Sequence, residues 1–371
     1  MTRSIKTEIN RRDFLSVAAT GTAAAALLSS PYVIRPAMAA NEDISLLTWE
    51  TYSEDPWLEE FSKANNVKVT AVRAGSVDEM FAKISSGAVT PDVIYVDTSI
   101  IPRLRKQDIL APIDAARVPN LKNVSPAIDY KKSNIVDGNL YALPYNWGPI
   151  PMMYRADAVK DGTDSWKTMW DAKYTGRVSM ADDSFMSVVV VAIVAGAANP
   201  YSLTDAEYQK VTDLLKTLRP QVKAMTTGNN DTQTLFSSGE VDLGMCMNPP
   251  IVANLKKEGK NVAYSIPKEG VPSWLDCAML TKKGDRDIVY KFLDAQLSLP
   301  WQKRFIEFAV SPGVLDVKTA TAEGVKPDVI DQTVMSLLDK PDFWGTLRLF
   351  QNVEDTDRRL QLWNDFKAGT L

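Results

Sequence analysis

The sequence predicts an α/β protein of two lobes, each built on an open, mostly parallel sheet with flanking helices. Strand-like and helix-like segments alternate with short connections from residue 44 to residue 96, which is typical of parallel sheets covered by helices. Of the 371 residues, 332 follow the first 39. A single hydrophobic core stops growing at roughly 250 to 300 residues. The length therefore favours two lobes over one.

The first 39 residues have the pattern of an export signal. Arg11 and Arg12 precede Phe14-Leu15 and a short Ala-rich run, which resembles the address read by the bacterial pathway that exports folded proteins. Small residues at positions 37 and 39 predict cleavage after Ala39, and no Cys for a lipid anchor lies nearby. The apolar run is too short for a membrane span. We expect a soluble periplasmic protein; an uncleaved anchor and a disordered leader are the alternatives.

The amino-acid composition argues against several kinds of function. The chain has no histidine, which removes the commonest zinc ligand and every Ser-His or Cys-His nucleophile. Its formal charge of −4 becomes −7 without the leader's +3, which disfavours a nucleic-acid partner. Cys246 and Cys277 are too few for a metal site; they either form a disulfide or stay buried as thiols. No phosphate-binding glycine loop is present, and we expect neither a cofactor nor a metal.

The first lobe is predicted to begin as β-α-β-α-β. Trp57, Leu58 and Phe61 form the apolar face of its first helix, and Ser76 with Glu79 matches a capping box at the start of the second. The expected strands are 44–49, 67–72 and 92–96, and the expected helices are 56–64 and 76–87.

A second α/β pattern follows the segment 145–149. Its helix at 204–218 is capped by Thr204, with Glu207 in the capping-box position. An apolar run spans 188–194. The expected strands are 177–180, 241–247 and 263–267, and the expected helices beyond them are 285–308, broken near Leu299-Pro300, then 326–338 and 353–366.

Aromatic residues and carboxylates recur together at the expected strand ends, where ligands sit in open α/β sheets. Aromatic faces attract an ammonium group, and carboxylates supply charge-assisted hydrogen bonds to it. Each residue alone also has an ordinary explanation, as a core ring or a helix cap. Their joint placement predicts a cleft for an amine. The residues are Trp49 and Tyr52, Asp97, Asp182 and Asp183, and Trp274 and Asp276.

Several short motifs occur in an order and spacing that together are specific. They are 47–52 (Leu-Thr-Trp-Glu-Thr-Tyr) with 57–61, 141–148, 165–177, 180–183, 239–245, and 267–270 before 274–276. With these motifs, nearly the whole chain after residue 39 resembles the periplasmic solute-binding proteins of ABC importers, in the branch that binds spermidine and putrescine. The resemblance implies a type II periplasmic binding protein with a hinge between its lobes. It also implies no catalysis, a monomer, and delivery of a cationic amine to an inner-membrane ABC permease.

The resemblance also implies how the chain divides between the lobes. We expect the chain to cross to the second lobe near 150–152 and to return near 278–280. The implied ranges are 40–150 with 279–320 for lobe 1, and 151–278 with 321–371 for lobe 2.

The same resemblance assigns roles to individual residues. Trp49 and Tyr52 match aromatic ligand contacts, Asp183 and Asp276 match carboxylates that take the amines, and Trp274 matches the ring along the methylene chain. Trp49, Tyr52 and Asp97 are expected on one lobe, and Asp183 and Trp274 on the other. The remaining expected ligand-binding residues are Glu50, Thr98, Ser99, Met247 and Gln351.

Departures from the family pattern leave the ligand open. Met186 and Met247 stand where the family carries a glutamate and a tryptophan, and Ser99 stands where it carries a tyrosine. Asp97 and Glu50 stand where relatives carry neutral hydroxyl residues, so acidity has moved between the lobes. A polyamine of different reach fits this pattern, as does another amine-bearing solute.

Alternatives to a polyamine binder come from the same and from other classes. Thiamine and aminophosphonate binders remain open, whereas ferric-iron binders need a Tyr-Tyr pair that the sequence lacks. A carboxylate-pair hydrolase would use Asp182 or Asp183 with Asp276. Glu269, in a Lys-Glu-Gly turn, is expected to face water and to take no part in any of these sites.

Overall fold

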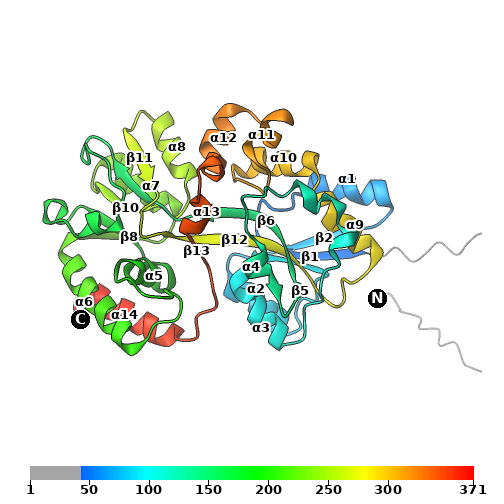
Figure 1. Cartoon of the computed structure of the whole chain (residues 1–371), viewed down its shortest axis with the longest axis horizontal. Helices are drawn as coiled ribbons and strands as arrows, with labels where there is room; N and C mark the ends of the chain where they lie inside the picture. The colour runs from blue at the N-terminus through cyan, green and yellow to red at the C-terminus, as the bar shows by residue number, and fades with distance from the viewer. Residues whose placement is uncertain (1–42) are drawn as a thin grey trace, which may run out of the picture. The chain divides into compact units, whose positions relative to one another are not determined.

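The computed structural model describes residues 43–371 (Figure 1). The expected export signal and its cleavage after Ala39 lie outside the described residues, so both stay predictions. Across residues 43–371, no helix has the length and apolar character that crossing a membrane requires.

The first lobe contains a mixed six-stranded sheet, counted over the described residues. Its order is β13-β12-β3-β1-β2, and β6 pairs with β12. β1 is parallel to β2 and β3, whereas β12 is antiparallel to β3 and β6. The strands are β1 Ile44–Thr48, β2 Val69–Arg73, β3 Val93–Asp97, β6 Ala142–Pro149, β12 Val271–Leu280 and β13 Leu347–Leu349.

The second lobe contains a mixed sheet in the order β11-β7-β10-β8-β9. β8 is parallel to β9 and β10, whereas β7 is antiparallel to β10 and β11. The strands are β7 Met152–Arg155, β8 Val178–Ala181, β9 Val222–Thr226, β10 Leu243–Met245 and β11 Val262–Ser265; a separate hairpin pairs β4 Ile135–Val136 with β5 Asn139–Leu140. The predicted two-lobed α/β class is confirmed, but the sheets are mixed, because β12 runs antiparallel to β3 and β6 and β7 runs antiparallel to β10 and β11.

The chain passes between the two sheets where β6 ends and β7 begins, at residues 149–152, near the expected first crossing. β12 pairs with β6 from Ser273 to Met279, so the return lies between β11 and β12, earlier than the expected 278–280. Trp274 and Asp276 therefore belong to a strand of the first sheet. The full lobe ranges stay a prediction.

Helices cover both faces of each sheet. In Figure 1, α5, α6 and α14 lie on one face of the second sheet and α7 and α8 on the other, while α1, α9 and α10 lie opposite α2 and α3 across the first. The helices are α1 Asp55–Asn65, α2 Val77–Ser85, α3 Ile101–Lys106, α4 Lys131–Asn134, α5 Ser184–Val194, α6 Asp205–Leu218, α7 Asn229–Ser238, α8 Pro250–Lys257, α9 Asp287–Gln296, α10 Leu299–Ala309, α11 Val317–Ala322, α12 Pro327–Thr333, α13 Phe343–Thr346 and α14 Thr356–Ala368.

Local signals explain several helix ends. The full capping box of Thr204 and Glu207 starts α6, as predicted. At α2 only half of the predicted box forms. Ser76 accepts from the Glu79 amide, but the Glu79 carboxylate accepts from the Gly75 amide at 2.8 Å instead of from Ser76. The expected break between α9 and α10 is confirmed.

The apolar run at 188–194 forms most of α5. Its residues are buried on all sides, because α5 packs between the second sheet, α6 and α14. A helix that is buried all round shows no polar face, which explains why the run has no visible period.

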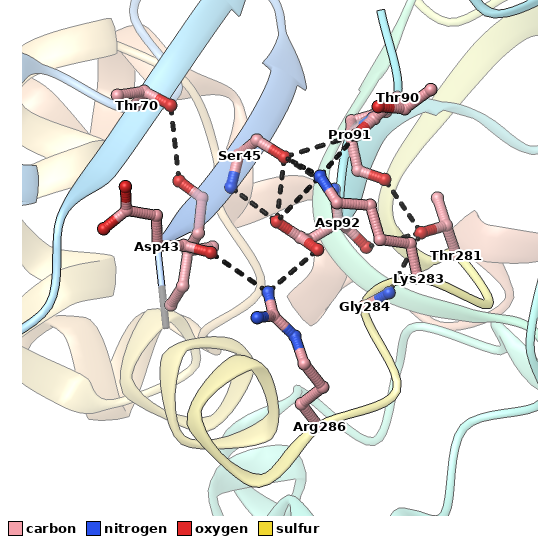
Figure 2. A network of polar contacts seen from close by, with 11 residues as sticks. Asp43, Ser45, Thr70, Thr90, Pro91, Asp92, Thr281, Lys283, Gly284 and Arg286 are labelled. Atoms are coloured by element: carbon pink, nitrogen blue, oxygen red, sulfur yellow. Dashed lines mark hydrogen bonds and ion pairs between the residues drawn. The ribbon is translucent and has the colours of Figure 1, made fainter. Parts of the chain in front are cut away.

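A buried carboxylate ties the start of β1 to the chain near α9 (Figure 2). Asp92 is 0% exposed and accepts from the Ser45 amide and hydroxyl at 2.7 and 2.8 Å, and from Arg286 at 2.9 Å. Arg286 also donates to the Asp43 carbonyl at 3.1 Å. A Cβ on Gly284 would lie 2.2 Å from the Asp92 carbonyl oxygen, so this packing requires glycine. The network holds β1 in place, and β1 carries Trp49 and Tyr52 at its carboxyl end.

Candidate functional site: an acidic, aromatic cleft

A cavity of about 660 Å³ is lined by residues of both lobes. Trp49, Asp97 and Asp182 lie at or just after the ends of strands, as predicted for an open α/β sheet. Trp274 and Asp276 instead lie within β12, because this strand runs on past the end of β3. None of the lining residues, all within 43–371, is lysine or arginine. The lining includes Trp49, Tyr52, Asp97, Asn146, Trp274, Asp276 and Ser311 from the first lobe and its connections, and Asp182, Asp183, Met186, Met247 and residues 226–229 from the second.

Two carboxylates lie side by side at the first-lobe end of this cavity. Asp97 ends β3, Asp276 lies on β12, and the two are direct partners in the antiparallel register. They are 5% and 8% exposed. Burial and the charge of Asp97 raise the pKa of Asp276 to about 8, and burial raises the pKa of Asp97 above its ordinary value. Two buried carboxyl groups, with no lysine or arginine among the described residues that line the cavity, make this end a candidate site for a positive group.

A relay of hydrogen bonds holds Asp276 in place. Tyr52 donates its hydroxyl to Asp276 at 2.5 Å and accepts from the Asn146 amide at 2.8 Å. Ser311 in turn donates to the Asn146 carbonyl oxygen at 2.7 Å. Burial and the charge of Asp276 raise the pKa of Tyr52 well above its ordinary value, so Tyr52 stays a donor. The relay leaves the second oxygen of Asp276 free for a ligand.

Tyr52 itself is fixed by packing. Its ring lies 5.3 Å from the rings of Tyr145 and Phe305, and its carbonyl accepts from the Tyr145 hydroxyl at 2.7 Å. Tyr52 is 7% exposed and lines the cavity, and its hydroxyl is engaged by Asp276 and Asn146. The predicted aromatic contact is therefore in the cavity wall, where it acts on a carboxylate.

Trp274 lies against the backbone of β6. A Cβ on Gly148, which is opposite Trp274 in the register, would lie 2.0 Å from the Trp274 ring. Only glycine at this position lets the indole lie flat on the strand and face the cavity. Trp49 is half-buried in the same wall, and its indole nitrogen has no hydrogen-bond partner among the described residues.

The second-lobe end of the cavity is less acidic than its two aspartates suggest. Asp183 caps α5 by accepting from the Met186 amide at 2.8 Å, and it is half-buried. Asp182 accepts from Trp363 and Lys367, each at 2.9 Å. The Lys367 ion pair lowers the pKa of Asp182. Asp183 is thus the carboxylate at this end that has no cationic partner among the described residues, and it lines the cavity with the apolar side chains of Met186 and Met247.

Four predicted ligand-binding residues lie elsewhere. Thr98, Ser99 and Gln351 line a second cavity of about 1560 Å³, and Phe350 lines both cavities. Gln351 accepts from Asn199 at 3.0 Å. Glu50 is exposed and lines neither cavity.

Cys246 and Cys277 are both free and buried, on strands or strand ends of different sheets. Burial raises the pKa of the Cys246 thiol to about 12, so the thiol is unreactive. Across residues 43–371, no group of three or more Cys, Asp or Glu side chains could hold a metal ion.

Sequence reasoning missed Asn146 and Ser311. Asn146 lies inside the motif 141–148 but was given no role. Ser311 follows Val310, a β-branched residue in the left-handed region with φ 48° at the end of α10. Such a conformation is strained and cannot be predicted from residue type, yet it turns Ser311 toward Asn146.

The fold is that of a two-lobed α/β protein whose lobes are joined by crossing strands and line a shared cavity, as in binding proteins. The chain belongs to the family described as bacterial extracellular solute-binding proteins, whose pattern matches residues 57–327.

Individual relatives agree with this family. The spermidine/putrescine-binding periplasmic protein 1 of Haemophilus influenzae is 28% identical over 264 residues, covering 70% of this chain and 71% of the relative. The putrescine/agmatine-binding protein of Pseudomonas aeruginosa is 27% identical over 261 residues, covering 66% and 71%. Among solved structures, the spermidine/putrescine substrate-binding protein PotD of Streptococcus pneumoniae superposes with a TM-score of 0.71 at 18% identity, covering 89% of this chain and 99% of that one. The predicted resemblance and fold are confirmed.

Proposed function

We propose that this protein captures an organic cation with a terminal amine, of the putrescine and spermidine class, in the periplasm and delivers it to an ABC permease of the inner membrane. One observation carries the proposal: the cavity is lined by four carboxylates, two indole rings and, within residues 43–371, no lysine or arginine. The names of the relatives from Haemophilus influenzae and Pseudomonas aeruginosa, which both include putrescine, support the same ligand class.

Each side chain has a distinct part in this proposal. Asp97 and Asp276 take one ammonium end by charge-assisted hydrogen bonds. Trp49 and Trp274 cover the methylene chain. A ring that also faces an ammonium group adds a cation–π attraction of roughly 0.5 to 2 kcal/mol. Asp183 takes the second end. The lobes close around the ligand, and affinity comes from these desolvated pairs rather than from buried area.

Other ligands and activities fit the cavity less well. An aminophosphonate needs cationic donors for its phosphonate group, and the lining offers none within residues 43–371. The hydrolase alternative pairs Asp182 or Asp183 with Asp276, but Asp182 is ion-paired with Lys367 and Asp183 caps α5. We therefore propose that the protein does no chemistry on its ligand. Thiamine is also a cation, and the thermal-shift screen described next distinguishes it from the amines.

The test is a thermal-shift screen of the chain from residue 40 onward against putrescine, spermidine, agmatine, thiamine and aminoethylphosphonate. The uncharged diol 1,4-butanediol is the control for putrescine, because it has the same carbon chain without ammonium groups. A ligand at 100 times its Kd adds about 2.7 kcal/mol to stability. We expect a shift with at least one polyamine and none with the diol. Stabilisation by thiamine alone, or by no cation, would contradict the proposal.

The export route is tested separately, because it depends on residues outside the described part of the chain. Replacing Arg11 and Arg12 by lysine should abolish export, since the proposed pathway reads the arginine pair rather than its charge. Cell fractionation measures the mature protein in the periplasm. Undiminished periplasmic protein would contradict the twin-arginine route while leaving the ligand proposal unchanged.

A further inference from the structure

The two carboxylates at the first-lobe end of the cavity, Asp97 and Asp276, form a carboxyl pair set by strand register. β3 and β12 are antiparallel, and the two residues are directly opposite each other. Side chains directly opposite on such strands project from the same face, with Cβ atoms roughly 4.5 to 5.5 Å apart. Both residues line the same cavity and both are more than nine-tenths buried. The strand register therefore fixes the two backbone positions opposite each other on one wall of the cavity.

Nothing in the described residues balances the charge of this pair. Tyr52 donates one neutral hydrogen bond to Asp276, and the Ser99 amide donates one to Asp97. No lysine or arginine of residues 43–371 lowers the pKa of either carboxyl. In the first lobe, the titratable groups around the pair are Tyr52, Tyr95, Tyr145 and Cys277. Burial and the charge of Asp97 raise the pKa of Tyr201, and Arg348 and Arg359 reduce this rise. Across the cavity lie Asp182 and Asp183.

We propose that Asp97 and Asp276 act as one seat, which holds a shared proton when the cleft is empty and a single ammonium end of the ligand when it is full, so that capture exchanges one proton for one cation. This deepens the proposed function and rests on it. Two carboxylates this close and this buried cannot both ionise without a cation between them. The raised pKa of Asp276, about 8, agrees with a proton retained at neutral pH.

The exchange conserves charge. In the empty cleft the pair carries two carboxyl groups and one proton, for a net charge of −1. In the filled cleft both carboxylates are ionised, the proton has left to the solvent, and one ammonium donates N–H groups to both, again for a net charge of −1. The buried site therefore never holds two unpaired negative charges. A neutral solute cannot replace the proton, which makes the pair selective for cations.

Asp97 is the residue that distinguishes this seat from a single carboxylate. Burial is the larger cause of the raised pKa of Asp276, and the charge of Asp97 adds to it, so that fewer protons would be displaced at neutral pH with Asp276 alone. The second lobe has no such pair, because Lys367 occupies Asp182. Proton exchange is therefore expected at one end of the ligand only, whatever the length of its chain.

The experiment is calorimetric titration of the protein with putrescine in two buffers of different ionisation enthalpy that carry no primary amine. The dependence of the observed enthalpy on buffer enthalpy counts the protons released. We expect close to one proton per putrescine at pH 7 and close to none at pH 9. The affinity should rise by up to tenfold per pH unit between pH 6 and pH 8, because the proton competes for the same seat.

Asp97→Asn tests the seat with little risk to folding, since an asparagine oxygen can still accept from the Ser99 amide. We expect proton release at pH 7 to fall below that of the unmodified protein and the pH dependence of affinity to flatten, because the variant removes the charge of Asp97 while burial of Asp276 remains. Unchanged proton release would contradict a shared proton. Asp108→Asn is the matched control, because this carboxylate is 83% exposed and should leave both quantities unchanged. Putrescine binding with no proton release and no pH dependence in the unmodified protein would overturn the shared proton.

A ligand-free measurement separates this proposal from the proposed function. Carbon NMR of isotope-labelled aspartates should show one carboxyl titrating near pH 8 in the empty protein, and Asp97→Asn should move that titration to lower pH. If putrescine does not bind but the high titration is present, the ligand class is wrong and the seat stands. If no aspartate titrates above pH 6, the seat is overturned whether or not putrescine binds.

Discussion

Replacing Asp276 by asparagine should weaken ligand binding and, at the same time, stabilise the ligand-free protein. Asparagine keeps the size of the side chain and can still accept from the Tyr52 hydroxyl, which lies 2.5 Å away. What it removes is a buried negative charge opposite Asp97. That charge attracts a cation but opposes folding when the cation is absent.

The pKa of Asp276 sets the size of the stability change. Folding raises this pKa from 3.8 to about 8, mainly by burial. A raised pKa in the folded state means that stability is full below pH 4 and is lost as the pH rises toward 8, because only the unfolded state ionises freely in that window. Each unit of pKa is worth about 1.4 kcal/mol, so the full loss is at most on the order of 5 kcal/mol. Asparagine does not ionise and escapes this loss.

Because ionisation of Asp276 opposes folding as the pH rises, the expected results differ between pH 4 and pH 8. Without ligand, the free energy of unfolding measured in urea should be about 2 to 5 kcal/mol higher for Asp276→Asn than for the unmodified protein at pH 8. At pH 4 the two values should differ little. Its putrescine affinity should fall by about 2 to 5 kcal/mol, the range for removing one partner of a buried charge pair. The exposed Asp108→Asn controls for the loss of one charge. A variant that is less stable than the unmodified protein at pH 8, or that binds putrescine equally well, would refute the reasoning.

Two further substitutions test the scaffold of the cleft. Gly148→Ala should displace the Trp274 ring and weaken putrescine binding at least tenfold, and overpacking should lower the free energy of unfolding by about 1 to 3 kcal/mol. Gly345→Ala is the control, because the space around its added Cβ is open. Tryptophan fluorescence and calorimetry measure both variants. Arg286→Ala should lower the free energy of unfolding by about 3 kcal/mol, because it leaves the buried Asp92 charge without its close partner; a loss under 1 kcal/mol in urea denaturation would show that the Asp92 network contributes little.

Local sequence signals predicted much of the scaffold. The apolar spacing of Trp57, Leu58 and Phe61 identifies α1, whose buried residues are these three. Thr204 and Glu207 mark the start of α6 because a capping box is formed within four residues. Such features depend on neighbours in the chain, so one sequence is enough to recognise them.

The site was harder to predict because it depends on contacts between distant segments. Asp97 and Asp276 are expected singly from the sequence, but their pairing is set by the register of two strands far apart in the chain. Glu269 shows the reverse case. Its turn suggests exposure, yet it is half-buried and accepts from the Ser165 hydroxyl and the Trp166 amide, so the expectation that it faces water was wrong.

Strand ends alone also do not say which cavity a side chain enters. Thr98 and Ser99 directly follow Asp97 but form a short 3-10 turn that carries them to the second cavity. Gln351 follows Phe350 to the same side. Whether these residues contact a ligand after the lobes close stays a prediction.

The most direct test of the central claim is a crystal structure of the protein grown with putrescine. We predict one ammonium nitrogen within about 3 Å of carboxylate oxygens of both Asp97 and Asp276, with the methylene chain against Trp274. Putrescine bound in the cavity lined by Thr98 and Gln351, with the carboxyl pair left without a cation, would contradict the account.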